Sequence, residues 1–398
     1  MSHEKLYSYI LPKYTFSPFQ SPKSIFFIHS LLTIQVYKAS SFSIDIPSIK
    51  VRFVAISICL KMEFKNKLTT DLNLRFPLVM APMFLVTNVK MVKEAMISGI
   101  LGCFPSLNFR DGNQLEEVLD ELNLFVRSRN GEKGNYGVNI IVQRANPFTE
   151  KHLAICLAKK VPVIITSLGN PQKAIVGAHA YGGKVFCDVT NLVHAKKCAE
   201  LGCDGFIAVG QGAGGHAGPY PVSLLIQALQ QAYPTIPVLA AGGIANGSTL
   251  LSAISAGASL GYSGTRFIAC TEATVSDEYK NAIVNSHMED IVLTERISGT
   301  PCTIINTEFA KKIGTKQNWF ERWMSKNPRT KKYFKMIIQR RGFNWLEDAV
   351  KPGNYDNLWC AGQTVEMIQT IKPISQIVAD YEIEFFEAYT NLKNNITN

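Results

Sequence analysis

A glycine-rich segment carries the residue that is best suited to proton transfer. Residues 208–219 read AVGQGAGGHAGP, so one histidine, His216, stands among five glycines directly after an apolar run. Glycine lets the backbone approach another group closely, although this density costs conformational entropy. A histidine side chain takes up or releases a proton near neutral pH. We therefore predict that a ligand lies against this backbone and that His216 handles a proton.

Two further glycine-bearing segments could hold a phosphate group. Residues 240–247 read AAGGIANG and residues 263–267 read SGTRF, and each leads from an apolar run into a helix-like stretch. Backbone N–H groups of such turns and of helix N-termini bind anions. We predict that these two segments together cradle a phosphate.

The elements that position these segments recur along the chain. Eight β-branched or apolar runs alternate with amphipathic stretches, at a spacing of about 20–25 residues in most cases. Residues 191–202, for example, show apolar positions at helical spacing and end in glycine. The pattern predicts a (β/α)8 TIM barrel, with the chemistry at the C-terminal ends of the strands and a phosphate site after strands seven and eight. A doubly wound open sheet is the structural alternative. The predicted strands are residues 77–81, 99–104, 136–142, 161–167, 184–189, 205–209, 236–241 and 259–263.

Two segments differ in composition from the barrel. Residues 1–61 contain seven Lys or Arg against two Asp or Glu and show no clean period, so we expect a disordered or non-native extension, with Met62 as the functional start. Residues 62–398 would form the barrel domain. Within it, residues 299–357 are expected to form a mostly helical, basic insert that acts as a lid near the barrel mouth. This insert holds eleven basic residues against Glu321 between positions 311 and 341.

Charge and cysteine content narrow the function classes. The net charge of +10 is concentrated in those two segments, and the sequence has no nucleic-acid motif, so we expect no nucleic acid as partner. Residues 24–37 are too short and too interrupted to span a membrane. The nine cysteines include no CxxC pair, which indicates neither a disulfide framework nor a metal site and favours a cytoplasmic setting. We expect Cys198 and Cys203 to be buried on a helix.

With these motifs in place, the chain from about residue 64 onward resembles the nitronate monooxygenase family, formerly called 2-nitropropane dioxygenases, which are FMN-dependent TIM barrels. AGGH at residues 213–216 is the most specific match. The resemblance implies that His216 is the catalytic histidine and that FMN is the cofactor. By the same resemblance, the residues at the cofactor would be Ala81, Pro82, Met83, Asn139, Asp188, Gly214, Gly215, Gly242, Gly243, Ser263, Gly264, Thr265 and Gln363.

The resemblance also implies a reaction. A nitronate or nitroalkane would be oxidised by O2 through FMN to a carbonyl compound and nitrite, with His216 as proton acceptor. One alternative is a related enoyl-acyl-carrier-protein reductase, which uses NAD(P)H and for which the basic insert could dock an acidic carrier. A flavin-binding barrel without turnover is another. The oligomeric state stays open, with a homodimer among the options.

Two positions depart from the family pattern. Many family members carry Glu where this chain has Gly212, and some place a basic or small residue at Asp188. A carboxylate beside the flavin would disfavour an anionic substrate unless the carboxylate is protonated or paired.

Other histidines lack a setting comparable to that of His216. His152, His179 and His194 fall in helix-like stretches, where we expect structural roles.

Overall fold

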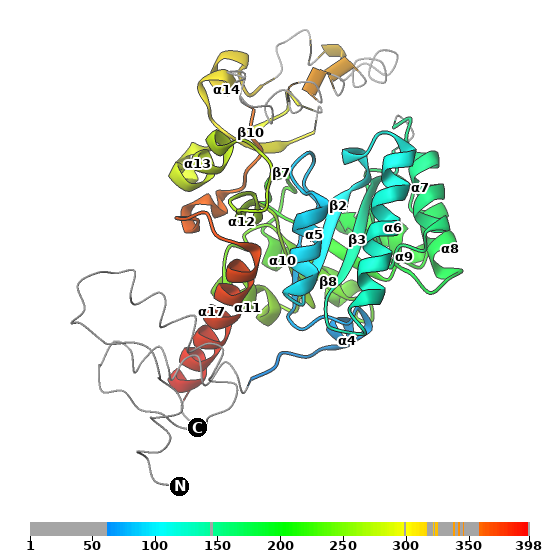
Figure 1. Cartoon of the computed structure of the whole chain (residues 1–398). Coiled ribbons are helices and arrows are strands. Elements are labelled where there is room, and N and C mark those ends of the chain that lie inside the picture. Colours follow the sequence, from blue (N-terminus) through cyan, green and yellow to red (C-terminus); the bar gives the residue numbers. More distant parts are fainter. Residues whose placement is uncertain are drawn as a thin grey trace, which may run out of the picture. The chain divides into compact units, whose positions relative to one another are not determined.

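Eight parallel strands close into a barrel in the computed structural model (Figure 1). The structure describes residues 62–143, 146–297, 300–316, 321, 323–324, 337–338, 341–342, 345 and 358–396. The strands pair in chain order, and β9 closes the barrel on β1 through pairs such as Met80 with Ser263. The strands are β1 (Leu78–Met80), β2 (Leu101–Pro105), β3 (Asn135–Ile141), β4 (Val163–Ser167), β5 (Lys184–Val189), β6 (Gly205–Val209), β8 (Val238–Ala241) and β9 (Leu260–Ser263).

This closed barrel confirms the predicted fold class and excludes the open doubly wound sheet. Each of the eight predicted runs overlaps a barrel strand. The prediction that residues 1–61 form an extension lies outside the described residues, as does most of the prediction for the insert. The first described elements of the insert are a strand, β11 (Cys302–Ile305), and a helix, α14 (Glu308–Ile313).

The helices between the strands form the outer layer (Figure 1). Several begin at an asparagine whose side chain accepts a hydrogen bond from the first helical turn, as Asn88, Asn191 and Asn246 do. The crossover helices are α5 (Val89–Ile97), α6 (Gly112–Ser128), α7 (Thr149–Ala158), α8 (Gln172–His179), α9 (Leu192–Glu200), α10 (Val222–Ala232) and α11 (Gly247–Ser255). A 22-residue helix, α17 (Ile374–Asn395), packs beside α11.

Two cores follow from the alternation of side chains along each strand. Inward-facing residues such as Val79, Ile165 and Phe186 form one buried cluster. At the N-terminal end of the barrel, Leu68 and Leu72 of the segment around α4 (Lys67–Asp71) join this cluster and close that end. The second cluster fills the layer between strands and helices.

A small second sheet lies beyond the barrel. It has the order β10 (Ile291–Thr294), β11 and β7 (Gly215–His216), and all its pairings are antiparallel. Because β7 belongs to the loop after β6, this sheet joins the sixth barrel loop to the beginning of the insert. The sequence pattern did not predict it.

The histidine and cysteine predictions have mixed outcomes. His152, His179 and His194 lie in α7, α8 and α9, as predicted. Cys198 is buried on α9, but the prediction that Cys203 lies on a helix is wrong, because the chain leaves α9 after Glu200 and Cys203 is buried in the connection to β6.

Candidate functional site

Three glycine loops and a C-terminal segment contact one another at the C-terminal ends of the strands. A Cβ atom on Gly214 would lie 2.8 Å from Thr265 Oγ1 and 2.9 Å from the backbone nitrogen of Gly362. One on Gly242 would lie 2.8 Å from the carbonyl oxygen of Gln211. The loops after β6, β8 and β9 therefore form one unit, in which the β6 loop contacts both of the others.

Glycine is required at these positions for two different physical reasons. Gly214 and Gly242 are needed because other protein segments approach them, so the space on their side-chain side is not open to a cofactor. Gly215 and Gly243 have φ angles of 75° and 77° and no atom within 4 Å of a built Cβ. These two positions favour glycine for their backbone conformation and leave open space beside it.

Backbone N–H groups in two of these loops have no acceptor among the described residues. No described residue accepts a hydrogen bond from the backbone N–H groups of Gly243, Gly264 or Thr265. Gly264 and Thr265 form the N-terminus of the short helix α12 (Thr265–Ile268), where N–H groups lack partners within the helix. These donors fit a phosphate group.

The side chains of the ninth strand and its loop hold the structure together. Ser263 Oγ lies 2.9 Å from Tyr381 Oη on α17 and donates to the carbonyl oxygen of Ile244. The Ser263 hydroxyl is therefore turned away from the barrel interior, and only the backbone of this residue could reach a cofactor. Thr265 Oγ1 accepts a 3.0 Å hydrogen bond from the N–H group of Gly362.

Residues at the other predicted cofactor positions border the same region. Ala81 donates its N–H to the carbonyl oxygen of Ser263 at 2.8 Å, so the loop after β1 is joined to the loop after β9. Pro82 and Met83 follow it, and Met83 Sδ would lie 3.7 Å from a Cβ on Gly264. Gln363 is exposed at the start of the 3-10 helix η4 (Gln363–Met367), next to Gly362.

Three polar side chains form a hydrogen-bonded chain across the ends of β3, β4 and β5. Asn139 Nδ2 donates to Ser167 Oγ at 2.7 Å, and Ser167 Oγ donates to Asp188 Oδ2 at 2.5 Å. All three occupy inward-facing positions. Because the single hydroxyl proton of Ser167 goes to Asp188, Asn139 must present its amide nitrogen to Ser167. No described residue donates to Asn139 Oδ1, so this oxygen could accept a hydrogen bond from a ligand.

The environment of Asp188 changes its acid strength. Burial raises the pKa of this carboxyl group to about 6, and the hydrogen bond from Ser167 opposes part of that rise. Burial, followed by the charge of Asp188, also raises the pKa of the Tyr262 hydroxyl well above its usual value. Because pH 7 lies above this pKa, the carboxyl group is mostly ionised there, and the hydrogen bond from Ser167 offsets only part of its conflict with an anionic ligand.

Sequence reasoning missed Ser167 and Thr303. Ser167 ends a predicted strand at an inward position, so its polarity there was a usable signal. Thr303 of β11 donates to the carbonyl oxygen of Ala213 at 2.5 Å and fixes the sixth loop, but nothing near it in the sequence reveals this partner.

His216 is exposed, and its backbone is held by the second sheet. It pairs with Cys302 of β11, while Gly215 pairs with Thr303. The histidine is thus positioned by the start of the insert and not by the barrel alone.

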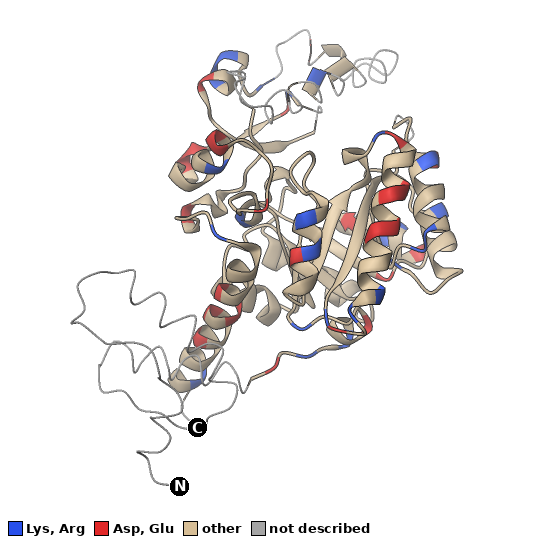
Figure 2. Ribbon diagram, in the orientation of Figure 1, with Lys and Arg blue, Asp and Glu red and all other residues tan. Residues whose placement is uncertain are grey.

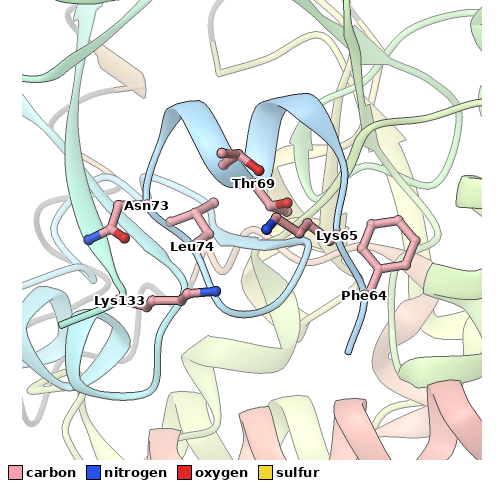
Figure 3. Close-up of a pocket in the computed structure, with 7 residues that line it drawn as sticks. Phe64, Lys65, Thr69, Asn73, Leu74 and Lys133 are labelled. Carbon is pink, nitrogen blue, oxygen red and sulfur yellow. The ribbon is translucent and has the colours of Figure 1, made fainter. Parts of the chain in front are cut away.

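A pocket of about 140 Å³ lies at the opposite, N-terminal end of the barrel (Figure 3). It is separate from the glycine loops and is lined by Phe64, Lys65, Thr69, Thr70, Asn73, Leu74 and Lys133. In the described part of the chain, no cluster of three or more His, Cys, Asp or Glu is arranged to hold a metal ion. None of the described helices combines the length and apolar character of a membrane span.

Comparisons with known proteins identify a family for this chain. The family model described as nitronate monooxygenase matches residues 113–382. The chain is 27% identical over 294 residues to a probable nitronate monooxygenase of Staphylococcus aureus (strain Newman), covering 63% of this chain and 80% of that one. FabK from Thermotoga maritima has a similar structure, with a TM-score of 0.71 and 29% identity, over 84% of this chain and 100% of that one.

A further relative carries a different activity in its name. The chain is 29% identical over 255 residues to (3aS,4S,5R,7aS)-5-hydroxy-7a-methyl-1-oxo-octahydro-1H-indene-4-carboxyl-CoA dehydrogenase of Mycobacterium tuberculosis (strain ATCC 25618 / H37Rv), covering 63% of this chain and 69% of that one. The names of the two sequence relatives therefore point to different reactions.

Proposed function

Because the chain belongs to the nitronate monooxygenase family, we propose that it is an FMN-dependent oxidoreductase that converts alkyl nitronates and O2 into carbonyl compounds and nitrite. One observation carries the proposal. The loop that bears His216 contacts both the β8 loop and the β9 loop, whose backbone donors are unpartnered within the described residues. This arrangement of a histidine-bearing loop beside backbone donors supports the proposal.

The residues present fit FMN. The N–H groups of Gly243, Gly264 and Thr265 would hold the phosphate. Asn139 Oδ1 would accept a hydrogen bond from an N–H of the flavin ring, since the chain through Ser167 and Asp188 sets the orientation of its amide. When bound, FMN would supply the redox chemistry, taking electrons from the substrate and passing them to O2.

His216 would act on the substrate. It would remove a carbon-bound proton from a neutral nitroalkane, or stabilise the charge of a substrate that is already a nitronate. The exposure of His216 on β7 is consistent with contact to a substrate. Asp188 contributes no positive charge, so stabilisation of the nitronate anion would depend on His216 and on backbone donors.

The first experiment follows the flavin absorbance of FMN-loaded protein under anaerobic conditions. We expect ethylnitronate to bleach the flavin, and nitrite to form once O2 is admitted. His216→Asn should slow oxidation of neutral nitroethane by about 100-fold or more, because general-base catalysis contributes about that much, and change nitronate oxidation far less. His194→Asn, which alters an exposed histidine on α9, should leave both rates unchanged. Equal nitroethane rates in wild type and His216→Asn would exclude His216 as the base.

The similarity to FabK supports a second candidate function, an enoyl thioester reductase that uses NAD(P)H. The same experiment separates the two. Flavin bleaching by NADPH, enoyl-thioester-dependent reoxidation and no nitrite from nitronates would favour the reductase. Bound FMN that neither nitronate nor NADPH reduces would instead indicate a binding protein without turnover.

A further inference from the structure

Two thiols meet where the ends of the insert come together. Cys302 Sγ and Cys360 Sγ are 3.9 Å apart, although 58 positions separate them in the sequence. Cys302 begins β11 and is 2% exposed, whereas Cys360 is only partly buried. Between them lies nearly the whole of the basic insert.

The backbone around this pair is already fixed in place. Ile304, two residues after Cys302, forms an antiparallel bridge with Cys360, and the N–H of Ile305 donates to the carbonyl oxygen of Trp359 at 2.9 Å. Tyr279 Oη donates to the carbonyl oxygen of Cys360 at 2.6 Å. A bond would require the sulfurs to approach by about 1.9 Å, since a disulfide is about 2.0 Å long, and side-chain rotation can provide much of that movement.

We propose that Cys302 and Cys360 form a reversible intramolecular disulfide when the protein meets hydrogen peroxide. This modification site does not depend on the proposed nitronate chemistry.

The two cysteines have different roles in the oxidation. Cys360 meets the oxidant first because it is the more exposed. The hydrogen bond with Cys360 and burial raise the pKa of the Cys302 thiol well above its usual value, which keeps Cys302 protonated until its partner has reacted. The thiolate of Cys360 attacks one peroxide oxygen, the O–O bond breaks, and a sulfenic acid and hydroxide form. The Cys302 sulfur then attacks the Cys360 sulfur, the S–O bond breaks, and the departing hydroxide takes up the thiol proton as water. In total, two thiols and one peroxide give a disulfide and two waters.

The other described cysteines are less suited to this reaction. Cys103, Cys156 and Cys270 are buried, as is the group formed by Cys187, Cys198 and Cys203. Hydrogen bonding to Cys187 and burial raise the pKa of Cys198 far above its usual value. An oxidant in solution reaches Cys360 before any of these.

The Cys302–Cys360 disulfide would link the two ends of the insert next to the candidate site. Cys302 is the cross-strand partner of His216, and Cys360 lies two residues before Gly362, which binds Thr265. Oxidation would therefore tie the strand that holds His216 to the segment that holds the β9 loop.

Peptide mapping of the full-length wild type tests the proposal without any variant. The protein is treated with hydrogen peroxide, its free thiols are alkylated, and it is digested with trypsin without reduction. We expect one linked peptide pair containing Cys302 and Cys360, two hydrogen atoms lighter than the reduced pair, that separates again after reduction with dithiothreitol.

The variants then assign the bond. Cys360→Ser and Cys302→Ser should each abolish the loss of two hydrogens, and Cys198→Ser should retain it. Recovery of Cys302 and Cys360 as separately alkylated peptides after peroxide treatment would overturn the proposal. A linked pair that joins Cys187 to Cys198 in place of these two would do so as well.

Discussion

At the scale of single residues, Asp188 governs how the barrel interior responds to pH. The eight barrel strands contain one acid, Asp188, and Figure 2 shows most charges on the surrounding helices. Its pKa is about 6 in the folded protein and 3.8 in the unfolded reference. The folded state therefore binds more protons between these values, and the free energy of unfolding falls as pH rises through that window.

Replacing Asp188 by Asn should remove this pH dependence. The amide oxygen can still accept the hydrogen bond from Ser167, but no charge is buried above pH 6. We expect Asp188→Asn to be more stable than wild type at pH 7.5 by about 1–3 kcal/mol, and no more stable at pH 4. Urea unfolding at several pH values measures this. Glu117→Gln, at an exposed acid on α6, should follow the wild-type curve; a parallel curve for Asp188→Asn would contradict the assignment.

At the scale of elements, Gly243 allows a matched comparison of ligand binding and backbone strain. Gly243 and Gly182 have φ angles of 77° and 83°, and a built Cβ meets no atom within 4 Å at either position. Gly182 lies in the α8–β5 connection, at the opposite end of the barrel from the glycine loops. Alanine at either position should lower the free energy of unfolding by about 1–2 kcal/mol through the left-handed backbone conformation.

Only Gly243→Ala should also weaken FMN binding, because its methyl group would occupy the space beside the anion donors. We expect at least a tenfold higher dissociation constant for Gly243→Ala, measured by quenching of FMN fluorescence, and an unchanged value for Gly182→Ala. Equal affinities of the two variants would place the phosphate elsewhere.

The barrel strands were predictable from the sequence, whereas the second sheet was not. Apolar periodicity identified all eight barrel strands, because a strand buried in a parallel barrel has a local signature. The second sheet has no such local signature. Gly215 and His216 have low strand propensity, and they pair with residues about 87 positions away, Cys302 and Thr303. The position of His216 was predictable from the glycine loop, but the strand that holds it was not.

At the scale of the whole molecule, the last helix joins distant parts of the chain. Phe385 of α17 is 3% exposed and packs edge-on against Phe64 and Phe76, which precede the first strand. A Cβ on Gly247 would lie 2.2 Å from the backbone nitrogen of Phe385, so α11 and α17 pack backbone to backbone. One turn earlier on the helix, Tyr381 holds the Ser263 side chain.

Removing the Phe385 side chain should therefore destabilise the entire barrel. We expect Phe385→Ala to lower the free energy of unfolding by about 3–5 kcal/mol, the cost of emptying a buried aromatic site, whereas Tyr389→Ala should cost less than about 1 kcal/mol. Tyr389 lies one turn later on α17 and is 43% exposed, so it controls for helix propensity. Denaturant unfolding followed by fluorescence and by circular dichroism should give one coincident transition in both variants. If Phe385→Ala instead unfolds in two steps, with the barrel transition unchanged, α17 is an appendage and does not support the β9 loop.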